Sequence, residues 1–401
     1  MGERERFSAF YFKDFRLFWL SQFISFSGTW MHSTAQGWLV YSMTGSPLYL
    51  GLVSAAGSLP VLLFTLLGGV FADRLAKRNL LLTTQTLSIL PALAIGVLAS
   101  SGLIKVWHVA ALVAFLGTVN AFDIPARHTF LTEIVERGNI LNAVALNSAA
   151  FNGARIIGPV IAGFTIANFG LPACFYLNAL SFVPVLLALS RIKARGEIRT
   201  GGSLTRDLLE GVQFLRGQQG VWKAMLVVAF FSLLGIPFMT MLPVFAEEIL
   251  GVGPKGLGFL AGSAGIGAFI AAVGLAFKGD IREKQRLMTL TSILFPALLI
   301  AFAQSKNYYL SLALLLGVGW ALVSFLAIAN TSIQLKAPDA LRGRVMSVYA
   351  LVFLGLAPIG NSLMGVLAEG LGTPTAVTLT SCLCLLASLG ISWGLPAGRQ
   401  A

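Results

Sequence analysis

Residues 69–78 of the chain read GVFADRLAKR, and this charged segment separates two long apolar runs at 47–72 and 79–101. Such interruptions are rare, because only 11% of the 401 residues are charged and 56% are hydrophobic. A soluble protein carries about 25% charged residues. With so little polar surface, the chain must face lipid. Backbone groups in lipid need internal hydrogen bonds, so we predict an all-α membrane protein.

The other apolar runs are also long enough to cross a bilayer, which takes about 20 residues. Twelve transmembrane helices are predicted at 15–42, 47–72, 79–101, 107–128, 140–168, 171–190, 220–249, 255–278, 286–304, 308–335, 343–368 and 373–395. The one long polar stretch, 191–219, carries periodic leucines between charges, which predicts an amphipathic helix on the inner membrane face. We therefore expect an N-terminal six-helix bundle at 1–190, a cytoplasmic linker at 191–219 and a C-terminal six-helix bundle at 220–401.

The two predicted bundles resemble each other in sequence. Residues 137–163 and 339–365 lie 202 positions apart, and each stretch runs from a charged turn into a helix rich in Gly and Pro. Duplicated halves with a binding site between them are a known transporter architecture. The repeat therefore predicts two pseudo-symmetric bundles.

The 28 Lys and Arg residues are distributed unevenly around the predicted spans. With the N-terminus in the cytoplasm, 24 of them lie in inner segments, and only Lys105, Lys255 and Lys306 lie in outer loops. Because cytoplasmic loops are enriched in Lys and Arg, we predict a multi-pass protein of the bacterial inner membrane with both termini cytoplasmic. The basic residues that give the net charge of +12 then serve to orient the protein in the membrane, and we expect no nucleic-acid partner.

Residues 69–78 resemble the signature loop of the major facilitator superfamily, in which Gly, then Asp-Arg, then a basic pair follow the second span. Ala76 stands where the family usually has Gly. The resemblance implies the twelve-helix major facilitator fold, with Asp73 holding the start of the eleventh helix near Arg344. The gating residues expected from this loop are Gly69, Asp73, Arg74 and Arg78. The alternative is that the basic residues are topogenic charge alone.

Residues 158–163, GPVIAG, resemble a motif that marks antiporters in the same superfamily. Small residues at Ala154, Gly158 and Ala162 predict a groove for a neighbouring helix, and Pro159 predicts a kink. Ala162 replaces the more usual Gly. Gly158 and Pro159 are therefore expected to contribute to gating.

Further short segments resemble the branch of the superfamily that holds the enterobactin exporter and the macrolide-efflux proteins. They are FDIPAR at 122–127, LNAVALNS at 141–148 and RIIGP at 155–159, together with GTW at 28–30 and TGSP at 44–47. This resemblance implies export but names no substrate. Residues 107–122 lack the Arg that many drug–proton antiporters carry in the fourth span, so the sequence departs here from the standard proton relay of those antiporters.

Ionisable residues inside predicted spans are candidates for function, because burial in lipid is costly. Asp123 and Arg127 lie four residues apart on one helix face and are expected to pair. Arg155 lies deep in the fifth span. We expect these three residues to couple transport to protons. For Arg155 the alternative is a structural cation held by carbonyl groups or by Asn147 and Asn152.

A polar stripe on the first span continues on the fourth and tenth, whereas the seventh span is apolar. The residues expected to line a substrate cavity are Gln22, Thr29, His32, Gln36, Asn120, Phe238, Met241, Ser324 and Gln334. A cavity with one polar wall and one apolar wall suits an amphipathic or aromatic solute.

The sequence thus predicts a secondary active transporter that exports such a solute, a drug or a siderophore for example, by alternating access and proton antiport. The alternative is an uncoupled facilitator or flippase for a lipid-like substrate. Expected partners are the solute, protons and membrane lipids, and we expect a monomer. No cofactor, metal or enzymatic activity is expected, since no span carries a catalytic triad, paired carboxylates or a metal cluster.

Overall fold

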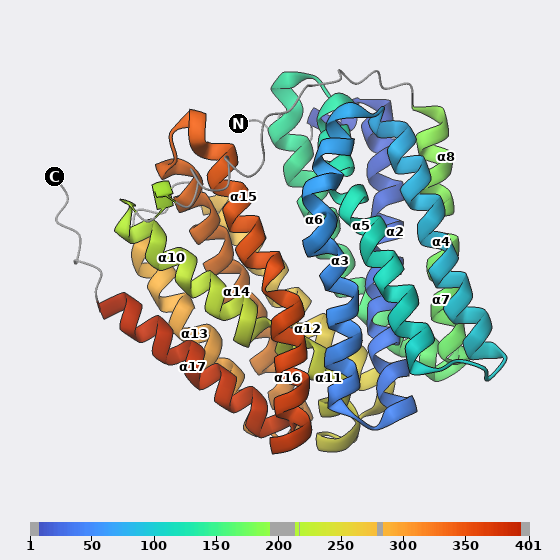
Figure 1. Ribbon diagram of the computed structural model, residues 1–401, viewed down its shortest axis with the longest axis vertical. Coiled ribbons are helices and arrows are strands. Elements are labelled where there is room, and N and C mark those ends of the chain that lie inside the picture. Colours follow the sequence, from blue (N-terminus) through green and yellow to red (C-terminus); the bar gives the residue numbers. More distant parts are fainter. Residues whose placement is uncertain (1–7, 193–212, 216, 279–283, 394–401) are drawn as a thin grey trace. The chain divides into compact units, whose positions relative to one another are not determined.

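The computed structural model describes residues 8–192, 213–215, 217–278 and 284–393, and Figure 1 shows their helices. In chain order the helical elements are η1 Ser8–Tyr11, α2 Lys13–Thr44, α3 Pro47–Arg74, α4 Lys77–Ser100, α5 Val106–Glu133, η2 Arg137–Asn139, α6 Ile140–Phe169, α7 Leu171–Ser181, α8 Val183–Arg191, α10 Gln219–Phe230, η3 Phe231–Gly235, η4 Ile236–Met241, α11 Leu242–Val244, η5 Phe245–Ile249, α12 Gly253–Lys278, α13 Lys284–Gln304, α14 Tyr308–Lys336, α15 Asp339–Gly355, α16 Ala357–Leu371 and α17 Thr373–Trp393. Most of the amphipathic helix predicted at 191–219 lies outside the described residues.

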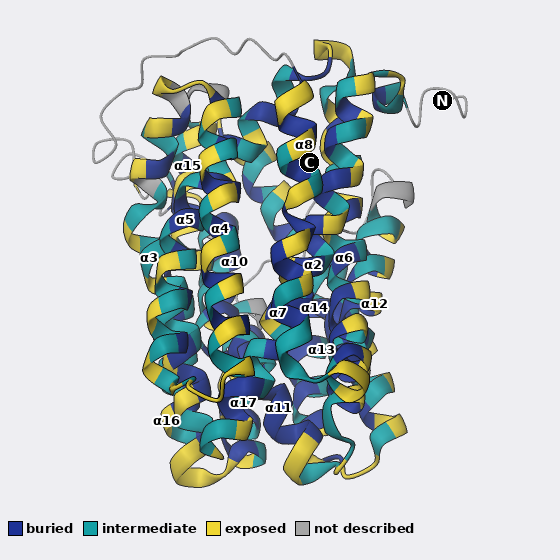
Figure 2. Cartoon of the chain, turned by 90° about the vertical axis from the view of Figure 1, so that its right-hand side faces the viewer, coloured by how far each residue is buried: buried dark blue, intermediate teal, exposed yellow. Residues whose placement is uncertain are grey.

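Eleven helical segments of the described chain are long and apolar enough to cross a membrane, and they match the second to twelfth predicted spans in order. The first predicted span is α2, whose 32 residues also suffice but include buried polar side chains such as Gln22 and His32. Large hydrophobic residues are exposed along helices in both parts of the chain, for example Leu63, Leu187 and Leu386 (Figure 2). Such a surface requires lipid, and the predicted all-helical membrane fold is confirmed.

The chain divides into two compact units that exchange short segments. Unit 1 comprises Met1–Gly45, Ala56–Gly202 and Gly253–Gly262, and unit 2 comprises Ser46–Ala55, Ser203–Val252 and Ser263–Ala401. The helices α3 and α12 therefore each contribute to both units. Within unit 2, the first turn of α3 is held by Glu369 of α16, which accepts hydrogen bonds from Ser46 Oγ at 2.7 Å and from the Leu48 amide at 3.2 Å.

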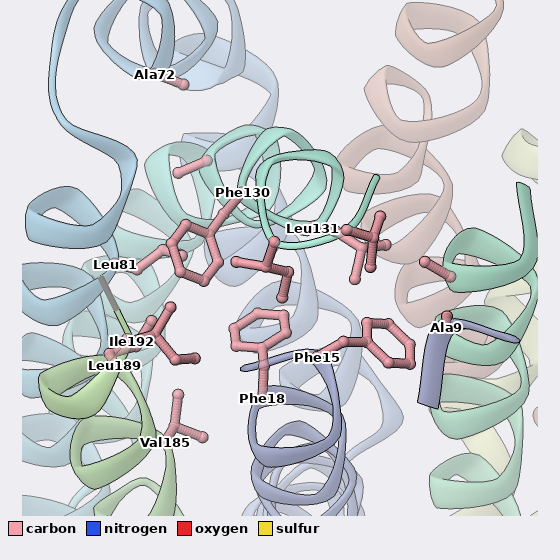
Figure 3. Packing of buried hydrophobic residues seen from close by; sticks show 14 residues of the cluster. Ala9, Phe15, Phe18, Ala72, Leu81, Phe130, Leu131, Val185, Leu189 and Ile192 are labelled. Carbon is pink, nitrogen blue, oxygen red and sulfur yellow. The ribbon is translucent and has the colours of Figure 1, made fainter. Parts of the chain in front are cut away.

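The core of unit 1 forms where α2 packs against α5, α6, α7 and α8. Phe18 of α2 meets Phe130 of α5 edge-on, with ring centroids 5.2 Å apart, and Leu81 and Leu189 lie in the same cluster (Figure 3). Trp19 donates from its indole nitrogen to the Leu146 carbonyl at 2.8 Å, which fastens α2 to α6. These contacts bury the end of unit 1 that carries the charged loops.

Unit 2 contains the least regular span, because residues 231–249 alternate between π, 3-10 and α turns. Pro237 and Pro243 lie in this stretch and cannot donate helical hydrogen bonds. Phe231 fills the centre, with its ring centroid 4.6 Å from Phe295 and 4.9 Å from Phe325. The apolar seventh span predicted from the sequence is thus an irregular and mostly buried segment.

A pair of glycines supports the internal repeat. In unit 1, a Cβ on Gly117 of α5 would collide with the Gly57 carbonyl oxygen of α3, and in unit 2 a Cβ on Gly319 of α14 would collide with the Ala264 carbonyl oxygen of α12. Gly117 and Gly319 are 202 positions apart, which is the offset of the sequence repeat. Both units therefore make the same close helix contact at equivalent positions.

Candidate functional site

A buried ionic cluster lies inside unit 1, centred on Asp123 of α5. The Asp123 side chain is 1% exposed, and its Oδ1 accepts hydrogen bonds from Thr84 Oγ1 at 2.7 Å and Gln85 Nε2 at 2.8 Å. The Arg127 guanidinium pairs with the other carboxylate oxygen, one helical turn away. The predicted pairing of Asp123 with Arg127 is confirmed, and the three donors match an ionised carboxylate.

Several buried polar atoms near this cluster have no hydrogen-bond partner among the described residues. They are Arg127 Nε, Gln85 Oε1 and both amide atoms of Gln22. Gln22 lies one turn from Phe18 and from Phe26 on α2, and these two rings contact Phe130 and Arg127 of α5. Gln22 therefore lies at the interface of α2 with α5. Buried amide groups without hydrogen bonds raise the free energy of the folded state.

A row of aromatic rings and arginines runs from this cluster to α6. The Arg127 guanidinium carbon lies 4.8 Å from the Phe26 ring centroid, and Phe26 meets Phe151 edge-on at 5.4 Å. Phe151 in turn meets Trp30 edge-on at 5.7 Å, and the Arg155 guanidinium carbon lies 5.6 Å from the Trp30 ring centroid. Both arginines singled out from the sequence thus contact aromatic rings of α2.

The polar stripe of α2 is divided between the packed interior of unit 1 and its surface. His32 is buried, with Nδ1 3.2 Å from Asn178 Nδ2 of α7 and its ring against Phe175. Gln22 is buried as well, whereas Gln36 is half-buried and Thr29 is exposed. Whether these residues line a substrate cavity stays a prediction.

The other predicted cavity residues are also placed by the described chain. Asn120 of α5 is half-buried, and Phe238 and Met241 are buried in the irregular span of unit 2. Ser324 of α14 is buried, and Gln334 donates to Asn330 Oδ1 at 2.7 Å within the same helix. Their role in binding a solute is likewise a prediction.

The loop that carries the family signature joins α3 to α4. Lys77 is buried and its ammonium lies 3.3 Å from Glu133 Oε1 at the end of α5. Arg78 donates to the Leu189 carbonyl at 2.6 Å and the Ser190 carbonyl at 2.9 Å, at the end of α8. Arg74 is exposed, and the side chain of Asp73 lies outside the described part of the structure. The partners of the Lys77 and Arg78 side chains therefore belong to unit 1.

A close helix approach is found at Gly68, one residue before Gly69. A Cβ on Gly68 would collide with the Ala121 carbonyl oxygen of α5, whereas a Cβ on Gly69 would have no atom of the described residues within 4 Å. Successive helical residues point about 100° apart, so only one of two adjacent glycines can face α5. The gating role expected of Gly69 stays a prediction.

The glycine–proline motif of α6 has two packed faces. A Cβ on Gly158 would lie 2.5 Å from Trp30 Cβ and 2.7 Å from the Ser27 carbonyl oxygen, so α2 fills the predicted groove. On another face, a Cβ on Gly258 of α12 would lie 2.5 Å from the Pro159 carbonyl oxygen. The groove is confirmed, and it serves α2 and the first turns of α12 within unit 1.

Sequence reasoning missed four polar residues of unit 1: Thr84, Gln85, Glu133 and Asn178. Each of them contacts another helix. A weak signal existed in the polar run TTQT at 83–86, which interrupts an otherwise apolar span. Glu133 carried no such signal, because an acid at the end of a span resembles any loop residue.

Long apolar helices, one of which carries a buried ion pair, are typical of a polytopic membrane transport protein. The bacterial homolog of the human lysosomal transporter Spinster, in an inward-facing and unoccupied conformation, matches with a TM-score of 0.75. The match covers 95% of this chain and 97% of that chain at 12% identity. The nucleoside transporter NupG matches with a TM-score of 0.70, again at 12% identity, over 96% of this chain and all of NupG. These structures share the fold.

A model of the transmembrane secretion effector family matches residues 5–400, and the chain belongs to this family of the major facilitator superfamily. The multidrug efflux pump Tap of Mycolicibacterium fortuitum is 29% identical, over 84% of both chains. The staphyloferrin A transporter of Staphylococcus aureus is 26% identical, over 89% of this chain and 90% of that protein. The resemblance seen in the sequence is confirmed, and the protein is a transporter, not an enzyme.

Proposed function

We propose that the protein exports a small amphipathic or aromatic solute, such as a drug or a siderophore, and that proton antiport drives the export. The observation that carries this proposal is the buried carboxylate of Asp123, held by donors on α4 and α5. A carboxylate inside a membrane span is costly and marks a site of ion or substrate handling. The similarity to an efflux pump and to a siderophore transporter supports the solute class.

In this proposal the halves 1–190 and 220–401 alternate access to a central site, with the linker 191–219 and both termini in the cytoplasm of a bacterial cell. Asp123, Arg127 and Arg155 are assigned to coupling. Cavity residues are drawn from α2, α5, η4 and α14, and residues 69–78 with Gly158 and Pro159 form the gate. The protein acts as a monomer.

The second candidate is an uncoupled facilitator or flippase for a lipid-like substrate. It is favoured by the three donors on the Asp123 carboxylate, because a carboxylate matched in this way suits a fixed structural ion. Under this proposal Asp123 takes no part in proton transfer during transport.

Flux measurements in proteoliposomes distinguish the two candidates. Purified protein is reconstituted, and uptake of a fluorescent amphipathic dye is followed with and without an imposed pH gradient, with protein-free liposomes as the control. An exporter coupled to protons accumulates dye above its equilibrium level only when the gradient is present. Dye that equilibrates at the same rate and to the same level in both conditions rules out antiport.

A further inference from the structure

The row of rings and arginines in unit 1 forms a surface with its own chemistry. We call it the aromatic–arginine face and define it by Phe26, Trp30, Arg127, Phe151 and Arg155. Three rings follow one another edge to face, with guanidinium groups against the first and the last ring. Edge-to-face rings leave ring faces free to accept a further flat ring.

Part of this face is open. Phe151 is 43% exposed, Trp30 and Arg155 are half-buried, and the neighbouring Thr29 and Ser148 are exposed. Arg155 is the sixteenth of the 30 residues of α6, so it lies near the middle of the span. A cation and hydroxyl groups at this depth avoid lipid and turn toward water or a bound solute.

The two arginines have different contacts within the face. Arg127 is engaged with Asp123, and it contributes to the face through its contact with Phe26. Arg155 lies beside Trp30, where a planar guanidinium can hold a carboxylate, phenolate or sulfonate through two parallel hydrogen bonds. A ring stacked on Trp30 or Phe151 would bring an attached anionic group to Arg155.

The glycine–proline motif positions this arrangement. Gly158 lies one turn beyond Arg155, and its missing side chain lets the Trp30 Cβ and the Ser27 carbonyl oxygen approach α6. Pro159 cannot donate the helical hydrogen bond to the Arg155 carbonyl, which loosens α6 at this point. Gly158 and Pro159 are therefore positioning residues for the contact between Trp30 and Arg155.

We propose that the aromatic–arginine face binds an aromatic anion, with its ring against Trp30 and Phe151 and its anionic group on Arg155. The inference rests on the proposed function as an exporter and narrows the solute class. An aromatic cation would contact the rings but would not pair with Arg155. An aliphatic anion would pair with Arg155 but would not stack on the rings. Both therefore bind more weakly than an aromatic anion.

Equilibrium binding to purified protein in nanodiscs tests the proposal with three matched probes. They are 2-naphthoate, 2-naphthylmethylammonium and cyclohexanecarboxylate. We expect saturable binding of 2-naphthoate, which Arg155→Gln weakens at least about tenfold and Arg155→Lys weakens less. Phe151→Leu, at an exposed position, weakens naphthoate binding more than cyclohexanecarboxylate binding. Arg137→Gln removes an exposed charge of the same unit and leaves all three affinities unchanged.

The ratio of naphthoate to naphthylmethylammonium affinity is measured within each sample and is independent of the folded fraction. An unchanged ratio in Arg155→Gln, or no saturable naphthoate binding to the wild type, overturns the inference. Failure of the proposed function is a separate result: naphthoate then binds and equilibrates across proteoliposomes but is never accumulated by a pH gradient. If a pH gradient drives accumulation of 2-naphthylmethylammonium and naphthoate does not bind, the exporter proposal stands. The proposal that the face binds an aromatic anion is then overturned.

Discussion

The Lys77 ammonium lies 3.3 Å from Glu133 Oε1, with side-chain exposures of 3% and 16%. Lys77 is the first residue of α4 and Glu133 is the last residue of α5. Each charge therefore lies at the helix end whose dipole disfavours it, since helix N-termini are partly positive and C-termini partly negative. Their pairing compensates both helices and fixes the start of α4 against the end of α5.

Glu133→Gln should destabilise the protein, because it removes the acid that pairs with the buried Lys77 charge. Breaking a buried pair costs about 3–5 kcal/mol, and the partial exposure of Glu133 favours the lower end of this range. The measurement is the unfolding midpoint in detergent. The double variant Lys77→Met/Glu133→Leu should be more stable than the sum of the single effects predicts. Additive losses would show that the pair is not coupled.

Gly158→Ala should separate α2 from α6, because the new methyl group would lie 2.5 Å from Trp30 Cβ and 2.7 Å from the Ser27 carbonyl. Overpacking of this kind costs about 1–3 kcal/mol, and it should lower the melting temperature in detergent. Gly69→Ala is the matched control, since its methyl group would meet no atom of the described residues within 4 Å. Equal melting temperatures for the two variants would contradict the tight contact at Gly158.

The membrane orientation can be tested with single cysteines in a background that lacks the three native ones. Lys306 and Gly138 are both exposed, and the Lys/Arg distribution predicts that they lie on opposite sides. Lys306→Cys should react with an impermeant thiol reagent in intact cells, and Gly138→Cys should react only after the membrane is permeabilised. The reverse pattern would invert the predicted topology.

The sequence predicts those features that one helix determines by itself. Span positions follow from the length of apolar runs, and the contact between Asp123 and Arg127 follows from their spacing of four residues. Side-chain hydrogen bonds between helices were not predicted: Thr84 and Gln85 reach Asp123 from α4, and Asn178 reaches His32 from α7. These depend on helix rotation.

Helix rotation also decides which glycine beside the signature loop packs closely. The close contact with α5 is made by Gly68 and not by Gly69, because the rotation of α3 about its axis is set by packing. The Arg78 guanidinium binds the last carbonyls of α8, a contact that the motif does not predict, and its expected part in gating stays a prediction. A family motif identifies the residue types, whereas their partners come from the fold.

Asp123→Asn tests whether the buried carboxylate couples transport to protons. The change keeps an oxygen that can accept from Thr84 and Gln85, and it removes the charge that pairs with Arg127. Coupling requires a group whose protonation is linked to transport, and an amide side chain does not bind a proton at physiological pH. We expect the variant to lose solute accumulation driven by a pH gradient and to retain downhill solute exchange in proteoliposomes.

Thr84→Val is the matched control for Asp123→Asn, because it removes one hydrogen bond at 2.7 Å and leaves the carboxylate and Arg127 in place. An ordinary hydrogen bond contributes about 0.5–1.5 kcal/mol to the free energy of unfolding, and a bond to a charged acceptor such as Asp123 contributes up to about 3 kcal/mol. Thr84→Val should lower stability within this range. The variant protein should still accumulate solute when a pH gradient is imposed. If Asp123 is only a structural ion, the two variants should instead behave alike, with lower melting temperatures and intact gradient-driven accumulation. Gradient-driven accumulation by Asp123→Asn at the wild-type rate would therefore assign the carboxylate to folding and place the proton site elsewhere.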